Sequence, residues 1–250
     1  MSEHKKRLRF RWAASLPGEQ WAIYRQAIEA IHQAGVPLLL GGGFALATFT
    51  GRWRNTKDID FYIHPQDHKR VIAALDRAGF EDYFKRQPYD RSWSYRGVKA
   101  EVIADFLWGM ANHRAEVDEG WFERACWVRI KDQELRVIPP EQLLWCKLYI
   151  LQRSRCDWTD LFNLLYARGE AMDWEHLLRC LDEDAPLLQA LLTAYGWLCP
   201  RSARKLPRSL WRRLKMSPPH PGAPKRDRIR LLDSRDWFAG RVLRSKPLEV

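Results

Sequence analysis

The 250-residue sequence lacks several features that would assign it to particular classes of protein. No hydrophobic run approaches the roughly 20 residues that a membrane-spanning helix needs, so we expect no membrane association. The first twelve residues are basic and contain no hydrophobic core of a signal peptide, which predicts that the protein is not exported. Its five cysteines are odd in number and scattered, without a Cys-x-x-Cys pair, which favours reduced thiols over disulfides or zinc. The sequence therefore predicts a cytoplasmic protein.

Acidic residues are scarce in the last fifth of the chain. Residues 201–250 contain 15 Lys and Arg against four Asp and Glu, whereas the first 200 residues contain 27 of each kind. The net charge of +11 therefore lies entirely in residues 201–250. Such a segment predicts a polyanionic partner, most simply a nucleic acid such as tRNA. The alternative is that its hydrophobic residues, Trp211 and Leu214 among them, dock it on the rest of the chain while the charge keeps the surface soluble.

Hydrophobic patterning is most informative in residues 38–63. Three leucines, Leu38 to Leu40, are followed by three glycines, which predicts a buried strand that ends in a tight turn. Residues 44–49 then fit a short helix. Glycines in such a turn allow backbone N–H groups to converge on an anion at the helix N-terminus. We therefore expect Gly42 and Gly43 to lie in an anion-binding turn.

Two aspartates follow in a second hydrophobic strand. Asp58 and Asp60 alternate with Ile59, Phe61 and Ile63, so both carboxylates are expected on the same face of one strand. Two like charges side by side repel each other and need a cation. Mg²⁺ is the simplest candidate, because it takes oxygen ligands and is usually completed by waters and substrate phosphates.

These motifs resemble the core signature of the nucleotidyltransferase superfamily related to DNA polymerase beta, in its minimal bacterial form. The matching pieces are Gly42-Gly43-Phe44-Ala45, Arg54 and Thr56-Lys57-Asp58-Ile59-Asp60. The resemblance implies a third carboxylate on a neighbouring strand, and Asp105, within the hydrophobic run from Glu101 to Trp108, is the preferred candidate. Glu101, four residues earlier and expected on the same face, remains an alternative. Many members of the superfamily carry serine at the position of Gly43, so this chain lacks that hydroxyl.

A lysine in a later helix is a further candidate. From residue 139 the sequence predicts a helix through residue 152, in which Lys147 shares the hydrophobic face with Leu144, Leu148 and Leu151. Lysine seldom faces a core without an acidic or phosphate partner. The stretch 139–161 also resembles the helical segment of abortive-infection toxin nucleotidyltransferases, which implies that Lys147 contacts the nucleotide. The alternative is a lysine that snorkels past the helix edge.

Two acids follow that helix. Asp157 and Asp160 fit a helix cap and a first-turn acid of the next helix, so we assign them no catalytic role.

The resemblance implies an enzyme that transfers NMP from an NTP, such as ATP, to a hydroxyl of tRNA, another nucleic acid, a protein or a small molecule, with release of pyrophosphate. The catalytic residues, which would also bind Mg²⁺ or Mn²⁺, are then Asp58, Asp60 and Asp105. The expected nucleotide-binding residues are Gly42, Gly43, Arg54, Lys57 and Lys147. Asp105 would also accept the proton of the attacking hydroxyl.

The expected fold is α/β (α+β), with a small mixed sheet. We expect a catalytic core with an N-terminal helix in residues 1–112, a mainly helical domain in residues 113–200 and a basic extension in residues 201–250. Two alternative functions remain open. One is the toxin of a toxin–antitoxin pair, which would act by nucleotidyl transfer and bind an antitoxin. The other is an inactive module that binds nucleotide or nucleic acid.

Overall fold

The computed structural model describes residues 8–220 and residue 228, and this part of the chain forms two compact units. Unit 1 extends to Pro139, and unit 2 begins at Pro140. The division thus follows Pro139 rather than the expected residue 112. The reason is the hairpin of residues 126–137, whose strands pair with the sheet of unit 1 instead of joining the helices that follow.

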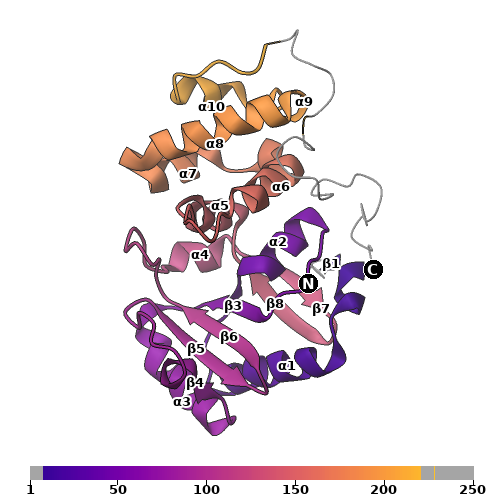
Figure 1. The fold of residues 1–250 in the computed structure, drawn as a ribbon, viewed down its shortest axis with the longest axis vertical. Helices are drawn as coiled ribbons and strands as arrows, with labels where there is room; N and C mark the ends of the chain where they lie inside the picture. The colour runs from indigo at the N-terminus through magenta and orange to yellow at the C-terminus, as the bar shows by residue number, and fades with distance from the viewer. Residues whose placement is uncertain (1–7, 221–227, 229–250) are drawn as a thin grey trace, which may run out of the picture. The chain divides into compact units, whose positions relative to one another are not determined.

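Unit 1 is built on a mixed sheet that, within the described residues, has eight strands in the order β1-β7-β8-β2-β3-β6-β5-β4 (Figure 1). The strands are β1 (Leu8–Arg9), β2 (Leu39–Leu40), β3 (Asp58–Tyr62), β4 (Glu81–Asp82), β5 (Ser94–Lys99), β6 (Val102–Leu107), β7 (Cys126–Ile130) and β8 (Gln133–Val137). The central strand β3 is antiparallel to β2 and parallel to β6, and β5 is antiparallel to β6. The prediction of a mixed α/β sheet is therefore confirmed.

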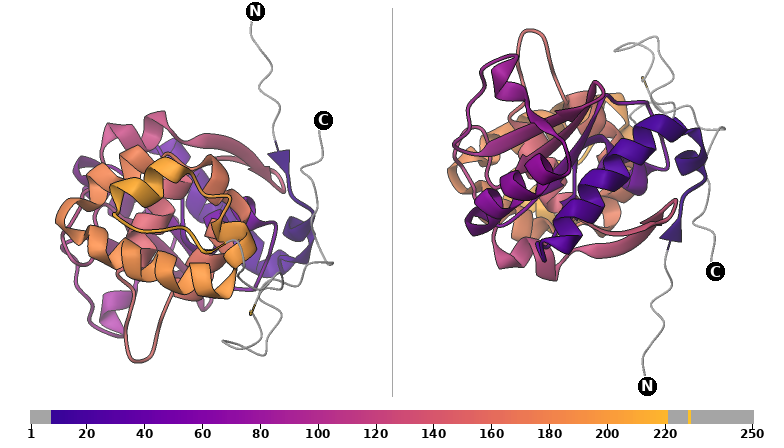
Figure 2. Two further views of the ribbon diagram at one scale, coloured as in Figure 1. Left: turned by 90° about the horizontal axis from the view of Figure 1, so that it is seen from above. Right: turned by 90° about the horizontal axis from the view of Figure 1, so that it is seen from below.

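Four α-helices accompany this sheet in the described part of unit 1. They are α1 (Gly18–Gln33), α2 (Gly42–Thr50), α3 (His68–Arg77) and α4 (Glu119–Glu123). Helices α1 and α3 pack side by side on one face of the sheet (Figure 2). Helix α2 starts directly at the glycine turn, two residues earlier than the sequence predicted. Short 3-10 helices cover Arg11–Ser15, Pro65–Asp67 and Tyr83–Lys85.

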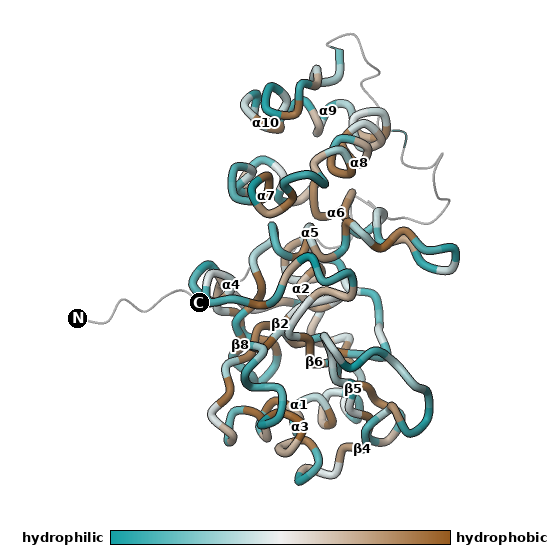
Figure 3. The backbone as a smooth tube through the Cα atoms, turned by 90° about the vertical axis from the view of Figure 1, so that its left-hand side faces the viewer, coloured by the Kyte–Doolittle hydropathy of each residue, from teal (hydrophilic) through white to brown (hydrophobic). Residues whose placement is uncertain are grey.

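The alternation of residues along β3 determines which side chains reach the core. Ile59 and Phe61 are fully buried, and Phe61 stacks on Phe106 of β6 with ring centroids 5.4 Å apart. The backbone tube shows hydrophobic residues in the interior strands β2 and β6 (Figure 3). Because side chains alternate along a strand, Asp58 and Asp60 lie on the opposite face from this hydrophobic layer.

Strand β4 at the edge of the sheet is short. It ends at Asp82, and Tyr83–Lys85 form a 3-10 turn instead of continuing it. The physical reason is a cap, because the Asp82 side chain accepts a hydrogen bond of 2.9 Å from the backbone N–H of Phe84. This cap ends the strand.

Unit 2 is mainly helical in its described residues. Its α-helices are α5 (Pro140–Leu148), α6 (Trp158–Arg168), α7 (Trp174–Leu181), α8 (Ala185–Leu198), α9 (Pro200–Ala203) and α10 (Arg208–Arg213), with 3-10 turns at Gly169–Ala171 and Asp182–Asp184. Helix α5 ends four residues before the predicted residue 152. The chain reverses direction there, with a β-bridge between Leu151 and Cys156 and a hydrogen bond of 3.1 Å from the Asp157 N–H to the Ile150 carbonyl.

The first residues of the expected basic extension fold onto this helical unit. Trp211 and Leu214 are each only 3% exposed, as the docking alternative predicted for them. Residues 221–227 and 229–250 of the extension lie outside the described residues. In the part of the chain that the structure describes, no helix is both long and hydrophobic enough to cross a lipid bilayer.

Candidate functional site

The three acids singled out by sequence lie on two neighbouring strands of unit 1. Asp60 in β3 pairs in register with Asp105 in β6, and Asp105 pairs in register with Arg96 in β5. Residues directly opposite each other on adjacent strands project from the same face of a sheet. Asp60, Asp105 and Arg96 therefore form a row across three strands, and Asp58 lies two residues along β3 on the same face.

Two other side chains respond to the combined charge of these acids. Burial raises the pKa of the Tyr24 hydroxyl in α1, and the carboxylates of Asp58, Asp60 and Asp105 raise it further. The pKa of Arg96 is raised first by its hydrogen bonds to Asp105, and the charges of Asp105, Asp58 and Asp60 add to that effect. The three carboxylates therefore create one region of negative charge on this face of the sheet.

The glycine turn lies directly against one of the acids. The backbone N–H of Gly41 donates to the Asp60 carbonyl at 2.8 Å, and a side chain at Gly42 would overlap the Asp60 carboxylate. Gly42 also has a left-handed backbone, with φ of 51°. Only glycine satisfies both conditions without strain. The N-terminus of α2, where backbone N–H groups lack partners within the helix, is thereby placed beside Asp60.

The other expected phosphate-binding residues lie at the start of α2 and in the connection from α2 to β3. A Cβ atom at Gly43 would make only an ordinary contact of 3.7 Å with Thr56 Cγ2, so sterics do not explain the absence of serine there. Arg54 and Lys57 are exposed in the connection between α2 and β3. The structure thus places both basic residues on the segment that leads into Asp58.

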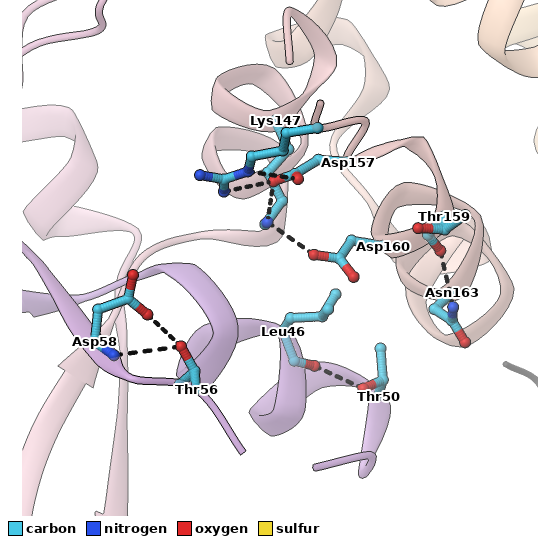
Figure 4. Close-up of polar contacts among 10 residues, drawn as sticks. Leu46, Thr50, Thr56, Asp58, Lys147, Asp157, Thr159, Asp160 and Asn163 are labelled. Carbon is cyan, nitrogen blue, oxygen red and sulfur yellow. Dashed lines mark hydrogen bonds and ion pairs between the residues drawn. The ribbon is translucent and has the colours of Figure 1, made fainter. Parts of the chain in front are cut away.

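Partly buried polar contacts fix that connection. The Thr56 hydroxyl donates to Asp58 Oδ1 (Figure 4), and the Gln20 amide donates to the Thr56 carbonyl at 2.5 Å and to the Tyr24 hydroxyl at 2.7 Å. Gln20 therefore ties α1 to the segment before β3. Sequence reasoning missed Gln20, since a glutamine on an amphipathic helix carries no signal for this contact.

Glu101 does not lie where the sequence placed it. It precedes β6, in the hairpin turn between β5 and β6, with a left-handed φ of 61°. Its side chain is 83% exposed and forms an ion pair of 2.7 Å with Arg86. The expectation that Glu101 shares the face of Asp105 is therefore wrong, because the strand alternation does not extend through the turn.

Arg96 is the main feature of this site that sequence reasoning missed. Its Nε and Nη2 atoms donate to the two carboxylate oxygens of Asp105, each at 2.7 Å. Within the described residues, no group of three or more His, Cys, Asp and Glu side chains is arranged to hold a metal ion. The donor chemistry nevertheless fits a hard divalent cation, since three carboxylates share one face and a cationic side chain already bonds one of them.

Lys147 lies in unit 2, where the structure gives it two acidic partners. Its ammonium donates to Asp157 at 2.5 Å and to Asp160 at 2.8 Å (Figure 4), and only 5% of the residue is exposed. Burial alone lowers the pKa of Lys147, but the charges of Asp160 and Asp157 outweigh it and the net shift is upward. A lysine with these contacts does not snorkel past the helix edge.

Asp157 is the N-cap residue of α6, and Asp160 lies in the first turn of that helix, as the sequence predicted. The Asp157 side chain makes no cap hydrogen bond to α6; it instead accepts hydrogen bonds from Lys147 and, at 3.0 Å, from Arg155. Burial raises the pKa of Asp157, whereas the hydrogen bonds from Arg155 and the charge of Lys147 lower it by more. The predicted positions of Asp157 and Asp160 at the start of α6 are therefore confirmed, but the reversal after α5 turns the Asp157 side chain toward Lys147 instead of the helix N–H groups.

Several solved structures are similar to this chain. The solution structure of the antibiotic-resistance factor ANT(2'')-Ia is 15% identical, covers 72% of this chain and 98% of its own, and gives a TM-score of 0.49. The lincomycin-bound lincosamide antibiotic adenylyltransferase LnuA is 17% identical, with 60% of this chain and 94% of its own covered and a TM-score of 0.42. An antigenic nucleotidyltransferase-like protein from Paracoccidioides brasiliensis is 18% identical, with 72% and 94% covered and a TM-score of 0.37.

These sequence identities are too low for the substrate of any of the three proteins to be assigned to this chain. A comparison with curated proteins gave no match. A family profile, in contrast, matches residues 7–198 of this chain, which include the glycine turn, Asp58, Asp60, Asp105 and Lys147. The family is described as "Uncharacterised nucleotidyltransferase". Since the match extends over more than half of the sequence, the chain belongs to this family of nucleotidyltransferases.

Proposed function

We propose that the protein transfers the NMP group of an NTP to a hydroxyl acceptor, with Mg²⁺ or Mn²⁺ as cofactor and pyrophosphate as the second product. The observation that supports this most directly is the shared face of Asp58, Asp60 and Asp105, with Gly42 packed against Asp60. A divalent cation on these carboxylates would supply positive charge for the phosphate oxygens. Carboxylates beside a glycine turn are suited to bind a nucleoside triphosphate whose phosphates carry a divalent cation.

In this proposal the protein groups have separate tasks. The N–H groups at Gly42 and Gly43 bind phosphate oxygens at the N-terminus of α2, and Arg54 and Lys57 meet the outer phosphates. Asp105 accepts the proton of the acceptor hydroxyl while the oxygen of that hydroxyl forms a bond to the α-phosphorus. The bond from the α-phosphorus to the bridging oxygen breaks, and pyrophosphate leaves.

A pyrophosphate-release assay tests this proposal. Purified protein should release pyrophosphate from at least one of the four common NTPs when Mg²⁺ or Mn²⁺ and a mixture of tRNA, cellular protein and small hydroxyl compounds are supplied. Chelation of the metal by EDTA should stop the release. Nucleotide binding without release, under every condition, would favour the inactive binding module instead. The toxin role, its antitoxin partner and the cytoplasmic location stay predictions.

Lys147 gives a prediction about stability. Replacing it with methionine removes the ammonium that two buried carboxylates share, so we expect the free energy of unfolding to fall by about 3–5 kcal/mol, the usual result of breaking a buried ion pair. Thermal and urea denaturation measure this directly. Lys205→Met is the matched control, because Lys205 pairs with Glu170 on the surface of the same unit, where both side chains are about 60% exposed. Equal stability of the two variants would contradict a stabilising contribution of the ion pairs of Lys147.

The nucleotide contact of Lys147 can be tested on the same variant while it remains folded. If the ammonium also bonds a phosphate, NTP binding should weaken by about 1.5–3 kcal/mol, as expected for a lost charge-assisted hydrogen bond. Unchanged affinity would leave Lys147 with Asp157 and Asp160 as its only partners. This part of the sequence interpretation stays a prediction.

The basic extension gives a prediction about the acceptor. A chain truncated after residue 220 keeps α9 and α10 and, with them, the buried Trp211 and Leu214. If the extension binds tRNA, this chain should bind NTP normally but bind total tRNA more weakly. The log–log salt slope should also become shallower, by about 0.9 for each lost duplex phosphate contact.

A second variant tests the folded part of the same extension. Arg208 and Arg212 are exposed in α10, and replacing both by glutamine removes two charges without shortening the chain. Weaker tRNA binding in this variant alone would place the contact on α10. If the full chain, the truncated chain and the glutamine variant bind tRNA equally, or if none binds it, the acceptor is not a nucleic acid held by this segment.

A further inference from the structure

Arg96 and Asp105 form an ion pair with two short hydrogen bonds, and the Arg96 side chain is more exposed to solvent than the Asp105 side chain. The guanidinium forms two parallel hydrogen bonds of 2.7 Å to the carboxylate. The Asp105 side chain is 9% exposed, whereas that of Arg96 is 38% exposed. A bidentate pair of this kind occupies one lone pair on each carboxylate oxygen. A second cation at Asp105 would lie beside the guanidinium and be repelled by it, so Arg96 opposes metal binding there unless it moves.

Arg96 is held by its backbone, and its guanidinium has a second partner besides Asp105. The Arg96 N–H donates to the Tyr89 hydroxyl at 2.8 Å, so the main chain is fixed beyond its strand pairing. The guanidinium carbon lies 5.5 Å from the ring centroid of Tyr83, a distance at which a cation is attracted by an aromatic face. Rotation of the side chain away from Asp105 can therefore leave the guanidinium between this ring and solvent while β5 stays in place.

The charge balance of the face explains why a cation is needed there. Asp58, Asp60 and Asp105 bring three negative charges to one side of two adjacent strands. Without a counter-charge, their repulsion opposes folding. Arg96 lies in register with Asp105 and supplies that charge from within the sheet.

We propose that Arg96 is a resident counter-cation that neutralises the carboxylate face in the absence of metal and releases Asp105 when a divalent cation binds. Arg96 is then a positioning residue, which acts through Asp105. This inference rests on the proposed metal site of Asp58, Asp60 and Asp105. The observed affinity for metal is then set by the free energy gained when the cation binds, reduced by the free energy needed to break the Arg96–Asp105 ion pair.

Mn²⁺ titration of the full chain, followed by electron paramagnetic resonance, tests the proposal. Arg96→Gln should bind Mn²⁺ about tenfold more tightly than the unchanged protein, which corresponds to about 1.4 kcal/mol. The same variant should melt at a lower temperature without metal, and Mn²⁺ should raise its melting temperature by more than that of the unchanged protein. A merely structural arginine would not increase metal affinity when removed.

Two further variants complete the test. Arg96→Lys keeps the charge but cannot form the bidentate pair, so its Mn²⁺ affinity should lie between those of the unchanged protein and Arg96→Gln, and it replaces Arg96→Gln if the latter does not fold. Arg91→Gln is the matched control, because Arg91 is an exposed arginine that pairs with Asp82 instead. It should leave Mn²⁺ affinity unchanged.

The outcomes separate this inference from the proposed function. If the unchanged protein binds Mn²⁺ and Asp105→Asn weakens that binding, the metal site stands. Equal or weaker Mn²⁺ binding by Arg96→Gln would then overturn only the counter-cation role. If neither protein binds Mn²⁺, the metal site and the proposed function are wrong, and the role of Arg96 falls with them.

Discussion

Replacement of Asp60 or Asp58 by asparagine should reduce nucleotidyl transfer by about a thousandfold or more while the fold survives. Each variant removes one of the carboxylate charges that, in the proposed reaction, would hold the cation facing the phosphate oxygens. Losses of this size follow when a group that stabilises developing charge is removed. Asparagine has nearly the same shape as aspartate, so the close contact of Gly42 with residue 60 is retained. At position 58 the asparagine oxygen can still accept the Thr56 hydroxyl. Pyrophosphate release measures the loss.

The stability of these variants carries a second expectation. Because one of three neighbouring negative charges is removed, the melting temperature without metal should be equal or higher. Asp76→Asn is the matched control, since it is the same substitution at an exposed position of α3. It should alter neither activity nor melting. Normal turnover in both Asp58→Asn and Asp60→Asn would remove the acids from the catalytic site.

Replacement of Asp105 by alanine should also reduce activity by orders of magnitude, whereas Glu101→Ala should change it little. Asp105 is buried, in register with Asp60 and bonded by Arg96, while Glu101 is exposed in a turn and bonded by Arg86. The structure thus favours Asp105 as the third carboxylate of the proposed site. Single-turnover and steady-state rates for both variants measure the difference.

The design of this comparison must allow for the partner of Asp105. Alanine leaves Arg96 without its carboxylate, so Asp105→Asn, which can still accept a hydrogen bond from Arg96, should accompany it. Both variants should be inactive if the carboxylate is required. A strong loss in Glu101→Ala together with activity in Asp105→Asn would transfer the role to Glu101.

The sequence alone was sufficient for the features that depend on local order in the chain. The three leucines before the glycines gave β2 and the turn, and the alternation of Asp58 and Asp60 with hydrophobic residues gave β3 with both acids on one face. These predictions succeeded because strand periodicity and the conformational freedom of glycine act over a few neighbouring residues. The family followed from the same short motifs, and the family match supports that assignment.

Pairing between distant segments decided the rest, because local periodicity does not contain it. Only the sheet register places Arg96 beside Asp105, and only the hairpin turn removes Glu101 from the face of the acids. The reversal after α5 likewise gives Lys147 its two carboxylates, where the sequence showed only an isolated lysine among leucines. A buried charge requires a partner, but which residue supplies it depends on chain segments that meet only in the folded protein.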